Sequence, residues 1–449
     1  MNAFDIAAAV TARRLSAKET AGDALQRIEA AGSLNAVVTI DPERTLADAE
    51  TVDRRIRAGE VLPLAGAPVV VKDNIWVAGW RVTQGSRLFD RFTAPQNAIA
   101  VARLKAAGAV VVGIGATSEF ACKGVTTSPS FGPTRHPLDP DLTPGGSSGG
   151  PSVAVAAGLV PIAIGTDAGG SIRRPAAHVG VVGFKPSFGA IPYGPGFAEP
   201  VNGISVIGPI ARDVRDTALA FGVMAGRDPR DPDAVDVDAV TTDIAGLRVA
   251  FSPRLGLEAA VDQVVADGVA AAVARLRQSG LTVEDRDPVW PAGMSEEALM
   301  PLQHAGLAAL YGDTFRQDPT RFDPDIAHQI ERGLSWSGVE VAAALAVSDQ
   351  IARAMAAFFV DIDILLTPTV PCVAWPLTQL GPAMIGGRSA GPRGHAVFTP
   401  FINHARVPAI SIPCGRDSRG LPFGLQMVAA RNADRTLLQA AAFAERALA

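Results

Sequence analysis

The sequence predicts an α/β fold in which a large mixed β-sheet is covered on both faces by α-helices. Three observations indicate this class. The 449 residues are 48% hydrophobic, which is enough for a large core. Short β-branched runs alternate with helix-like segments, and these runs lie at residues 67–71, 110–114, 160–165, 362–369 and 408–413. Because such runs come from both halves of the chain, we expect one sheet built by the whole sequence.

Residues 1–60 are predicted to form an N-terminal helical layer. Ser16 and Glu19 have the spacing of a capping box, ahead of an apolar-periodic segment that runs to Ile28. The Asp-Pro-Glu sequence at 41–43 opens a second helix that reaches Ile56. Acidic and basic residues interrupt the apolar positions of the first helix, so no signal peptide is expected.

The remaining elements follow in chain order. Residues 65–225 carry most of the strand signals, with a helix expected at 98–105. The polar stretch 226–238, rich in Asp, Arg and Pro, is the one candidate linker. Helices are expected at 257–281 and 339–359 inside a helical insertion at 255–360, and residues 361–449 complete the sheet with further strands. The chain 1–449 is therefore predicted to be a single domain.

Charge, hydropathy and cysteine content exclude several functions. The 40 basic and 45 acidic residues give a net charge of −5, and no basic patch favours a nucleic-acid partner. The longest apolar run, 153–164, is shorter than the roughly 20 residues of a membrane span, so no membrane partner is expected. Cys122, Cys372 and Cys414 lack metal-ligand spacing and cannot all pair. This pattern favours buried thiols, a reducing cytoplasmic location, and neither a metal nor another cofactor.

Three short segments concentrate the chemistry: Val-Val-Val-Lys-Asp-Asn at 69–74, Gly-Gly-Ser-Ser-Gly-Gly at 145–150 and Gly-Thr-Asp-Ala-Gly-Gly-Ser-Ile-Arg at 165–173. Taken alone, the run at 145–150 fits a flexible loop or a phosphate cradle, although it lacks the Gly-Lys-Ser/Thr ending of a P-loop. A dense apolar block follows it at once. This apolar block favours a buried turn whose glycines let the backbone approach other groups closely.

The segment 165–173 contains a candidate nucleophile. Gly169 and Gly170 precede Ser171 and allow a sharp turn whose N–H groups converge, as an oxyanion hole requires. The alternative is that Ser171 is the N-cap of a short helix that Pro175 stops. Asp167 and Arg173 are expected to pair across the turn as a structural clamp.

A serine nucleophile needs a base. None of the six histidines lies in a triad context, and the chain has no G-x-S-x-G sequence. Lys72 ends an apolar Val-Val-Val run, so a strand would carry its stem into the interior, where desolvation lowers the pKa of an amine. The alternative is a lysine that extends to the surface from a strand end.

Together these segments resemble the amidase signature family. Other segments fit the family in order and spacing, and they lie at 131–135, 183–186, 365–369, 408–413, 420–422 and 424–426. The resemblance implies the amidase signature fold, with the catalytic core at 65–225 and an insertion at 255–360 that shapes the substrate pocket. It also implies a serine hydrolase that cleaves amides.

The resemblance assigns a role to each candidate residue. Ser171 is the nucleophile that accepts the acyl group, and Lys72 is the base. Ser147 relays protons between them and is preceded by a cis peptide bond after Gly146. The backbone N–H groups that hold the oxyanion are those of Ala168, Gly169, Gly170 and Ser171. Asp167, Arg173 and Ser148 support the site, and Ser148 does so by hydrogen bonding within the turn.

The expected substrate is an aryl or small neutral amide, with water as co-substrate. Carbamates (urethanes) and esters present the same attackable carbonyl. Specificity is expected in the insertion and in the loops 123–130, 189–202 and 381–395. Phe188, Tyr193 and Phe197 are expected to line a moderately apolar pocket.

Two other functions stay open. One is the glutaminase subunit of an amidotransferase complex, which would need partner subunits that no feature of the sequence indicates. The other is a non-catalytic binding protein on the same fold, although a binding module has no need of Lys72, Ser147 and Ser171 together. A homodimer is also compatible with the sequence.

Overall fold

The computed structural model describes residues 1–201, 203–237 and 244–449. Residue 238 of the predicted linker and residue 202 of the predicted loop 189–202 lie outside these ranges. The helices are α1 (Ala3–Thr11), α2 (Ala17–Ala30), α3 (Pro42–Arg57), α4 (Ile99–Ala106), α5 (Gly149–Ala156), α6 (Arg173–Val179), α7 (Val214–Met224), α8 (Gln263–Gln278), α9 (Glu296–Gln317), α10 (Pro324–Ser335), α11 (Gly338–Phe358), α12 (Pro400–His404) and α13 (Asp434–Leu448).

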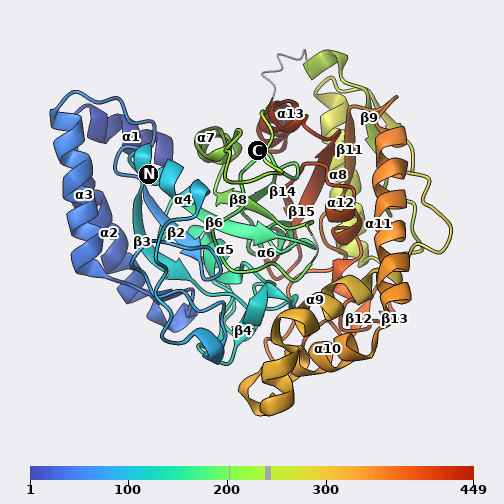
Figure 1. The fold of residues 1–449 in the computed structure, drawn as a ribbon. Helices are drawn as coiled ribbons and strands as arrows, with labels where there is room; N and C mark the ends of the chain where they lie inside the picture. The colour runs from blue at the N-terminus through green and yellow to red at the C-terminus, as the bar shows by residue number, and fades with distance from the viewer. Residues whose placement is uncertain (202, 238–243) are drawn as a thin grey trace.

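The centre of the molecule is one mixed sheet of eleven strands (Figure 1). They are β1 (Val37–Thr39), β2 (Pro68–Lys72), β3 (Val110–Gly115), β6 (Ile162–Asp167), β7 (Val182–Lys185), β8 (Val206–Ala211), β9 (Val249–Phe251), β10 (Val283–Asp285), β11 (Ile364–Pro368), β14 (Ala409–Arg416) and β15 (Pro422–Ala429). Two small hairpins, β4 (Thr127–Ser128) with β5 (Gly132–Pro133) and β12 (Met384–Ile385) with β13 (Arg388–Ser389), lie outside it.

The strand order is β1-β3-β2-β6-β8-β7-β14-β15-β11-β9-β10. β2 is parallel to β3 and to β6, whereas each adjacent pair from β6 to β11 along this order is antiparallel. β9 is parallel to both β11 and β10. The sheet therefore joins strands from both sides of the predicted linker. The prediction of a mixed sheet completed by the C-terminal strands is confirmed.

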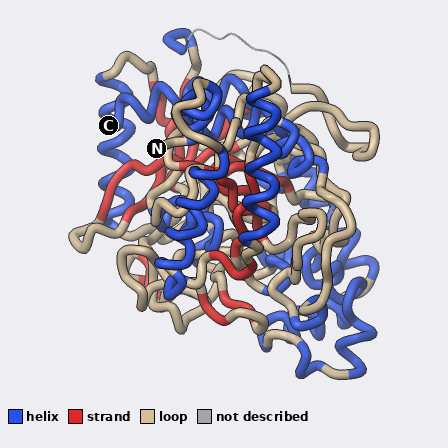
Figure 2. Tube along the Cα trace, turned by 90° about the vertical axis from the view of Figure 1, so that its left-hand side faces the viewer, coloured by secondary structure: helices blue, strands red, loops and turns tan. Residues whose placement is uncertain are grey.

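Helices cover both faces of this sheet, and Figure 2 shows the strands running between them. α4, α7, α8 and α13 pack on the face that carries Val69 and Val71 of β2. α1, α2, α3, α5 and α6 pack on the other face, which carries Val70. Because side chains alternate along a strand, Lys72 lies on the same face as Val70, the face covered by α5.

Local signals in the N-terminal layer are confirmed, with one omission. Ser16 and Glu19 form the predicted capping box at the start of α2, and Asp41 caps α3. The layer also contains the strand β1, which pairs antiparallel with β3 at the edge of the sheet. We did not predict β1 because three residues are too short for a clear alternation pattern.

The predicted insertion 255–360 is less uniform than expected. α8 packs against β11, β14 and β15, so it is a cover helix of the sheet rather than part of a separate layer. α9, α10 and α11 lie beside the C-terminal part of the sheet (Figure 1). Among the described residues, α11 is the one helix long and apolar enough, by length and composition, to cross a membrane. Its buried residues form a single seam, at Ala344, Ser348, Ile351, Met355 and Phe358.

Candidate active site

Lys72 is fully buried at the end of β2, at 0% exposure. Its Nζ lies 2.9 Å from Ser147 Oγ and 2.8 Å from Thr166 Oγ1, and it donates hydrogen bonds to both. Burial lowers the pKa of Lys72 to about 7, although the Asp167 carboxylate acts in the opposite direction. An amine with this pKa is available in its neutral form near neutral pH. The surface-lysine interpretation is therefore wrong.

The turn at 145–150 is closely packed, so the flexible-loop interpretation is also wrong. A Cβ atom on Gly146 would lie 2.5 Å from the carbonyl carbon and oxygen of Val125. One on Gly150 would collide with the backbone of Ala116. The peptide bond between Gly146 and Ser147 is cis, as the resemblance implies. These glycines serve close backbone approach rather than flexibility.

Ser148 connects the two glycine-rich turns. Its N–H donates to the carbonyl of Ser171 at 3.0 Å, and its hydroxyl donates to the carbonyl of Thr166 at 3.2 Å. The Oγ and Cβ atoms of Ser148 also pack against Gly165, where any side chain would collide. The expected structural hydrogen bonding of Ser148 is therefore present.

Ser171 lies in the turn between β6 and α6, with 6% of its surface exposed. The N-cap residue of α6 is Ile172, and no side chain caps this helix. Pro175 lies within the first turn, where a missing N–H is tolerated, and α6 continues to Val179. The N-cap interpretation of Ser171 is wrong, and its hydroxyl is left to line a cavity.

The backbone of the Ser171 turn differs in one respect from the expected oxyanion hole. Gly170 has a φ of +109°, a conformation that favours glycine. The N–H of Gly170 donates to Asp167 Oδ1 at 2.7 Å and is therefore not free to bind an oxyanion. The prediction that Gly170 is one of the four oxyanion-hole donors was wrong. Across the described ranges, no acceptor is recorded for the N–H groups of Ala168, Gly169 and Ser171.

Asp167 and Arg173 form the expected clamp, and both are fully buried. Arg173 Nη2 lies 2.9 Å from Asp167 Oδ1, and Nε lies 3.0 Å from Oδ2. Burial alone would raise the pKa of Asp167, but the Arg173 guanidinium and hydrogen bonds outweigh it and hold this pKa well below its usual range. Asn403 and Gln426, which we did not single out, complete the clamp: Asn403 donates to Asp167, and Gln426 Oε1 accepts from Arg173.

Two cavities meet at Ser171 and Ala168. The narrow cavity, of about 30 Å³, is lined among others by Asn74, Ser147, Thr166, Tyr193 and Phe197. The wide cavity, of about 340 Å³, is lined among others by Arg174, Gln303, His304, Arg393 and His395. The predicted specificity segments therefore do contribute, through Lys123, Val201, Pro392 and helices α9 and α10.

Of the three aromatic residues expected to line the pocket, Tyr193 and Phe197 do line the narrow cavity, and the expectation for Phe188 was wrong. Phe188 lines neither cavity and instead lies under the Arg406 guanidinium. Phe197 belongs to an aromatic cluster with Trp76, Phe89 and Phe92, which we did not predict. Cys122 is buried, as predicted, and it also lines both cavities, which we did not predict. Burial raises the pKa of this thiol to about 12, so it stays protonated.

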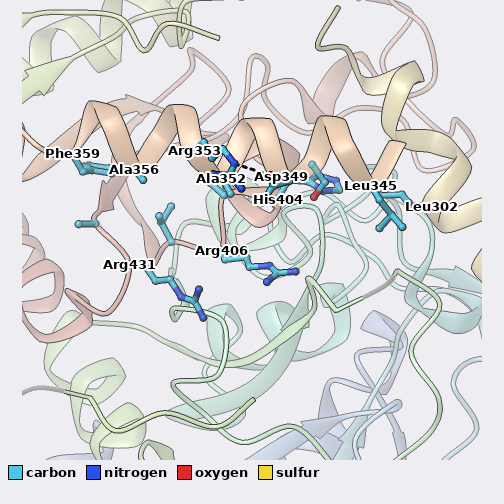
Figure 3. A pocket seen from close by; sticks show the side chains of 14 residues that line it. Leu302, Leu345, Asp349, Ala352, Arg353, Ala356, Phe359, His404, Arg406 and Arg431 are labelled. Atoms are coloured by element: carbon cyan, nitrogen blue, oxygen red, sulfur yellow. Dashed lines mark hydrogen bonds and ion pairs between the residues drawn. The ribbon is translucent and has the colours of Figure 1, made fainter. Parts of the chain in front are cut away.

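A larger cavity, of about 490 Å³, lies beside α11 and is shown in Figure 3. Leu345, Asp349, Arg353, His404 and Arg406 are among its lining residues, and none of the predicted site residues lines it. Size alone therefore does not single out the cavity that the predicted site residues share, which is the narrow cavity lined by Ser147 and Ser171, with Lys72 bonded to Ser147. In the part of the chain that the structure describes, no group of three or more His, Cys, Asp or Glu side chains could hold a metal ion.

Comparisons with known proteins agree with this fold. The family model described as Amidase matches residues 19–438. A glutamyl-tRNA(Gln) amidotransferase subunit of Deinococcus deserti is 37% identical over 97% of this chain and 94% of that protein. An acylamidase of Rhodococcus erythropolis is 36% identical over 98% of this chain and 94% of that protein.

A solved structure of a bacterial aryl acylamidase of the amidase signature enzymes superposes with a TM-score of 0.91, at 29% identity, over 100% of this chain and 96% of that chain. The chain belongs to the amidase signature family. As a member of this family it is a hydrolase that acts on C–N amide bonds.

Proposed function

We propose that the protein hydrolyses small linear amides through an acyl-enzyme on Ser171. Neutral Lys72 accepts a proton from Ser147, which accepts one from Ser171 as the latter attacks the amide carbonyl. The N–H groups of Ala168, Gly169 and Ser171 stabilise the oxyanion. The observation that carries this proposal is the fully buried Lys72 Nζ at 2.9 Å from Ser147 Oγ.

The same relay then works in reverse. An amide nitrogen leaves only when it is protonated, and in this proposal Ser147 passes that proton on from Lys72, whose Nζ lies 2.9 Å from Ser147 Oγ. Water releases the acyl group from Ser171. Aryl and other small amides are the proposed substrates, and carbamates and esters would react by the same attack because they present the same carbonyl. The protein is proposed to act on small molecules in the cytoplasm.

Labelling of the nucleophile tests the proposal. A fluorophosphonate is expected to modify the parent protein at Ser171, and Ser171→Ala is expected to abolish both labelling and amide hydrolysis. Ser152→Ala is the matched control, because the Ser152 hydroxyl is buried in α5 and has no hydrogen-bond partner among the residues that the structure describes. Normal amide hydrolysis by Ser171→Ala would refute the assignment.

The second candidate is a glutaminase that works within an amidotransferase complex, which the similarity to the Deinococcus deserti amidotransferase component favours. In that case ammonia would be released from glutamine only in the presence of a second protein of the complex. Purification of the tagged chain from its own host, followed by a glutaminase assay with and without any co-purified protein, separates the two. A binding protein without activity would fail every amide assay and the labelling test.

A further inference from the structure

Arg174 is a buried cation beside the proposed nucleophile, and it has no partner in the part of the chain that the structure describes. It lies three residues after Ser171 on α6, is 5% exposed, and lines the wide cavity together with Ser171. Within residues 1–201, 203–237 and 244–449, no acceptor or carboxylate contacts its guanidinium, and its Nε is buried without a hydrogen bond. Its neighbour Arg173 is the opposite case, because Asp167, Asn403 and Gln426 satisfy that guanidinium.

The carboxylates near Arg174 are already committed to other cations. Asp167 pairs with Arg173, and Glu296 pairs with Arg393. Asp325 faces Lys123 at 3.6 Å, and Lys123 also pairs with Asp323. The Arg174 guanidinium is therefore the one charged group in the wall of the wide cavity that has no counterion among the described residues.

Three imidazoles line the wide cavity, those of His304, His328 and His395, and none of them can supply a negative charge. Burial, together with nearby arginines, lowers the pKa of His304 to about 4 and that of His395 well below its usual value, so both rings are neutral. A buried and unpaired charge is costly unless a ligand or water compensates it. The wide cavity thus offers an anion site next to Ser171.

The proposed proton path determines which side of the substrate meets Arg174. Ser147 lines the narrow cavity but not the wide one, so the leaving nitrogen that takes its proton must lie on the narrow side. That cavity holds about 30 Å³, room for one group the size of water or ammonia. The acyl part of the substrate is then directed into the wide cavity, which holds Arg174.

We infer that the preferred substrate is a primary amide whose acyl part carries a carboxylate, and that Arg174 binds this carboxylate. This inference rests on the proposed amide hydrolysis. A guanidinium suits the role because its fork of N–H donors matches the two oxygens of a carboxylate. Hydrolysis adds water across the C–N bond and releases ammonia and a dicarboxylate. The inference replaces the neutral amide expected from the sequence with one that carries a negative charge.

Matched amide pairs test the inference. We expect kcat/KM for succinamate and glutaramate to exceed that for butyramide and pentanamide by roughly 10- to 100-fold. Arg174→Met, which keeps the length of the side chain, is expected to abolish this preference, measured as the ratio of kcat/KM for the charged and the neutral amide of each pair. Arg174→Lys keeps the charge and is expected to retain part of the preference.

Arg393→Met is the matched comparison, since Arg393 lines the same cavity but is paired with Glu296. The inference would be overturned if the parent enzyme hydrolysed the neutral amides as well as the charged ones. It would also be overturned if Arg174→Met lowered kcat/KM equally for charged and neutral amides, or if Arg393→Met lost the preference for charged amides as completely as Arg174→Met. If Arg174→Met does not fold, the parent enzyme and Arg174→Lys still decide the question.

A binding experiment separates failure of this inference from failure of the proposed function. Glutarate is expected to bind the Ser171→Ala protein, measured by calorimetry, and to bind the Ser171→Ala/Arg174→Met protein roughly tenfold or more weakly. Arg174-dependent binding without any amide hydrolysis would retain the anion site and refute the proposed function. Amide hydrolysis together with glutarate binding that does not depend on Arg174 would retain the proposed function and refute the anion site.

Discussion

The two sides of the active site differ in how completely their polar groups are satisfied. On the side of the glycine-rich turns, Lys72, Ser148, Asp167 and Arg173 are buried and each has protein partners. On the wall of the wide cavity, Arg174 Nε and His304 Nδ1 are buried and have no hydrogen-bond partner among the described residues. The side chains that shape the turns therefore have their partners in place before substrate binds, and the N–H groups of Ala168, Gly169 and Ser171 are left for the oxyanion. The wall, in contrast, has side-chain hydrogen-bonding capacity left for a ligand.

This difference teaches where each property of the enzyme resides. A proton relay must be in place before the substrate arrives, because misplacement of a catalytic group is costly in rate. Recognition groups can instead exchange water for substrate. The turns come from β2, α5 and β6 and the loops around them, while the wall comes largely from α9, α10 and the loops 121–124 and 380–395. Substitutions on the two sides should therefore fail in different ways.

The largest effect is expected from Lys72→Ala. Without the base, amide kcat should fall by about 10²–10⁴-fold, and ester kcat by less, because an alcohol leaves more readily than an amine. Lys185→Met is the matched control: Lys185 is equally buried, and burial also lowers its pKa to about 7, but its Nζ donates to the carbonyl of Pro186 outside both cavities. Steady-state kinetics on an amide and ester pair measures this, and equal losses in the two variants would contradict the proposed base.

A large loss of stability is expected from Asp167→Asn. This change leaves the buried Arg173 guanidinium without its carboxylate, which should reduce the free energy of unfolding by about 3–5 kcal/mol. Asp349→Asn is the control, since it breaks the exposed pair between Asp349 and Arg353 on α11 and should cost no more than about 1 kcal/mol. Denaturant unfolding measures both. Similar costs would mean that the clamp does not stabilise the turn.

A smaller effect is expected from pH. The charged form of Lys72 cannot accept a proton, and its pKa is lowered to about 7 mainly by burial. Amide kcat/KM should therefore rise with pH, by about tenfold per unit below pH 7, and level off above it. A pH–rate profile with circular dichroism at each point separates titration from unfolding. An acid optimum would contradict a neutral lysine base.

Local patterns in the sequence predicted much of this arrangement, because their signals depend on neighbouring residues. The capping box of Ser16, the apolar run that ends in Lys72, and the glycines around Ser147 and Ser171 all belong to this class. The central strands β2, β3 and β6 could be predicted for the same reason, since each is a continuous β-branched or apolar run.

Contacts between distant segments could not be predicted in this way. Thr166 meets Lys72, and Asn403 and Gln426 meet the Asp167–Arg173 clamp, only because the sheet brings these segments together. Likewise, Arg173 and Arg174 are adjacent and chemically identical in sequence. Which of the two is paired, and which lines a cavity, depends on the direction that α6 gives each side chain.

The smallest effect is expected from Ser148→Ala, next to the proposed relay serine. Its hydroxyl makes one hydrogen bond, to the carbonyl of Thr166, whose residue also contacts Lys72. Loss of this bond should cost about 0.5–1.5 kcal/mol of unfolding free energy. Amide kcat should change by only a few fold, because the N–H of Ser148 still holds the carbonyl of Ser171.

Ser147→Ala, by contrast, removes the relay and should lose activity as severely as Lys72→Ala with little change in stability. Kinetics and unfolding of the two serine variants, measured side by side, would distinguish a proton relay from a structural turn, and equal activities would contradict the distinction drawn between these neighbours.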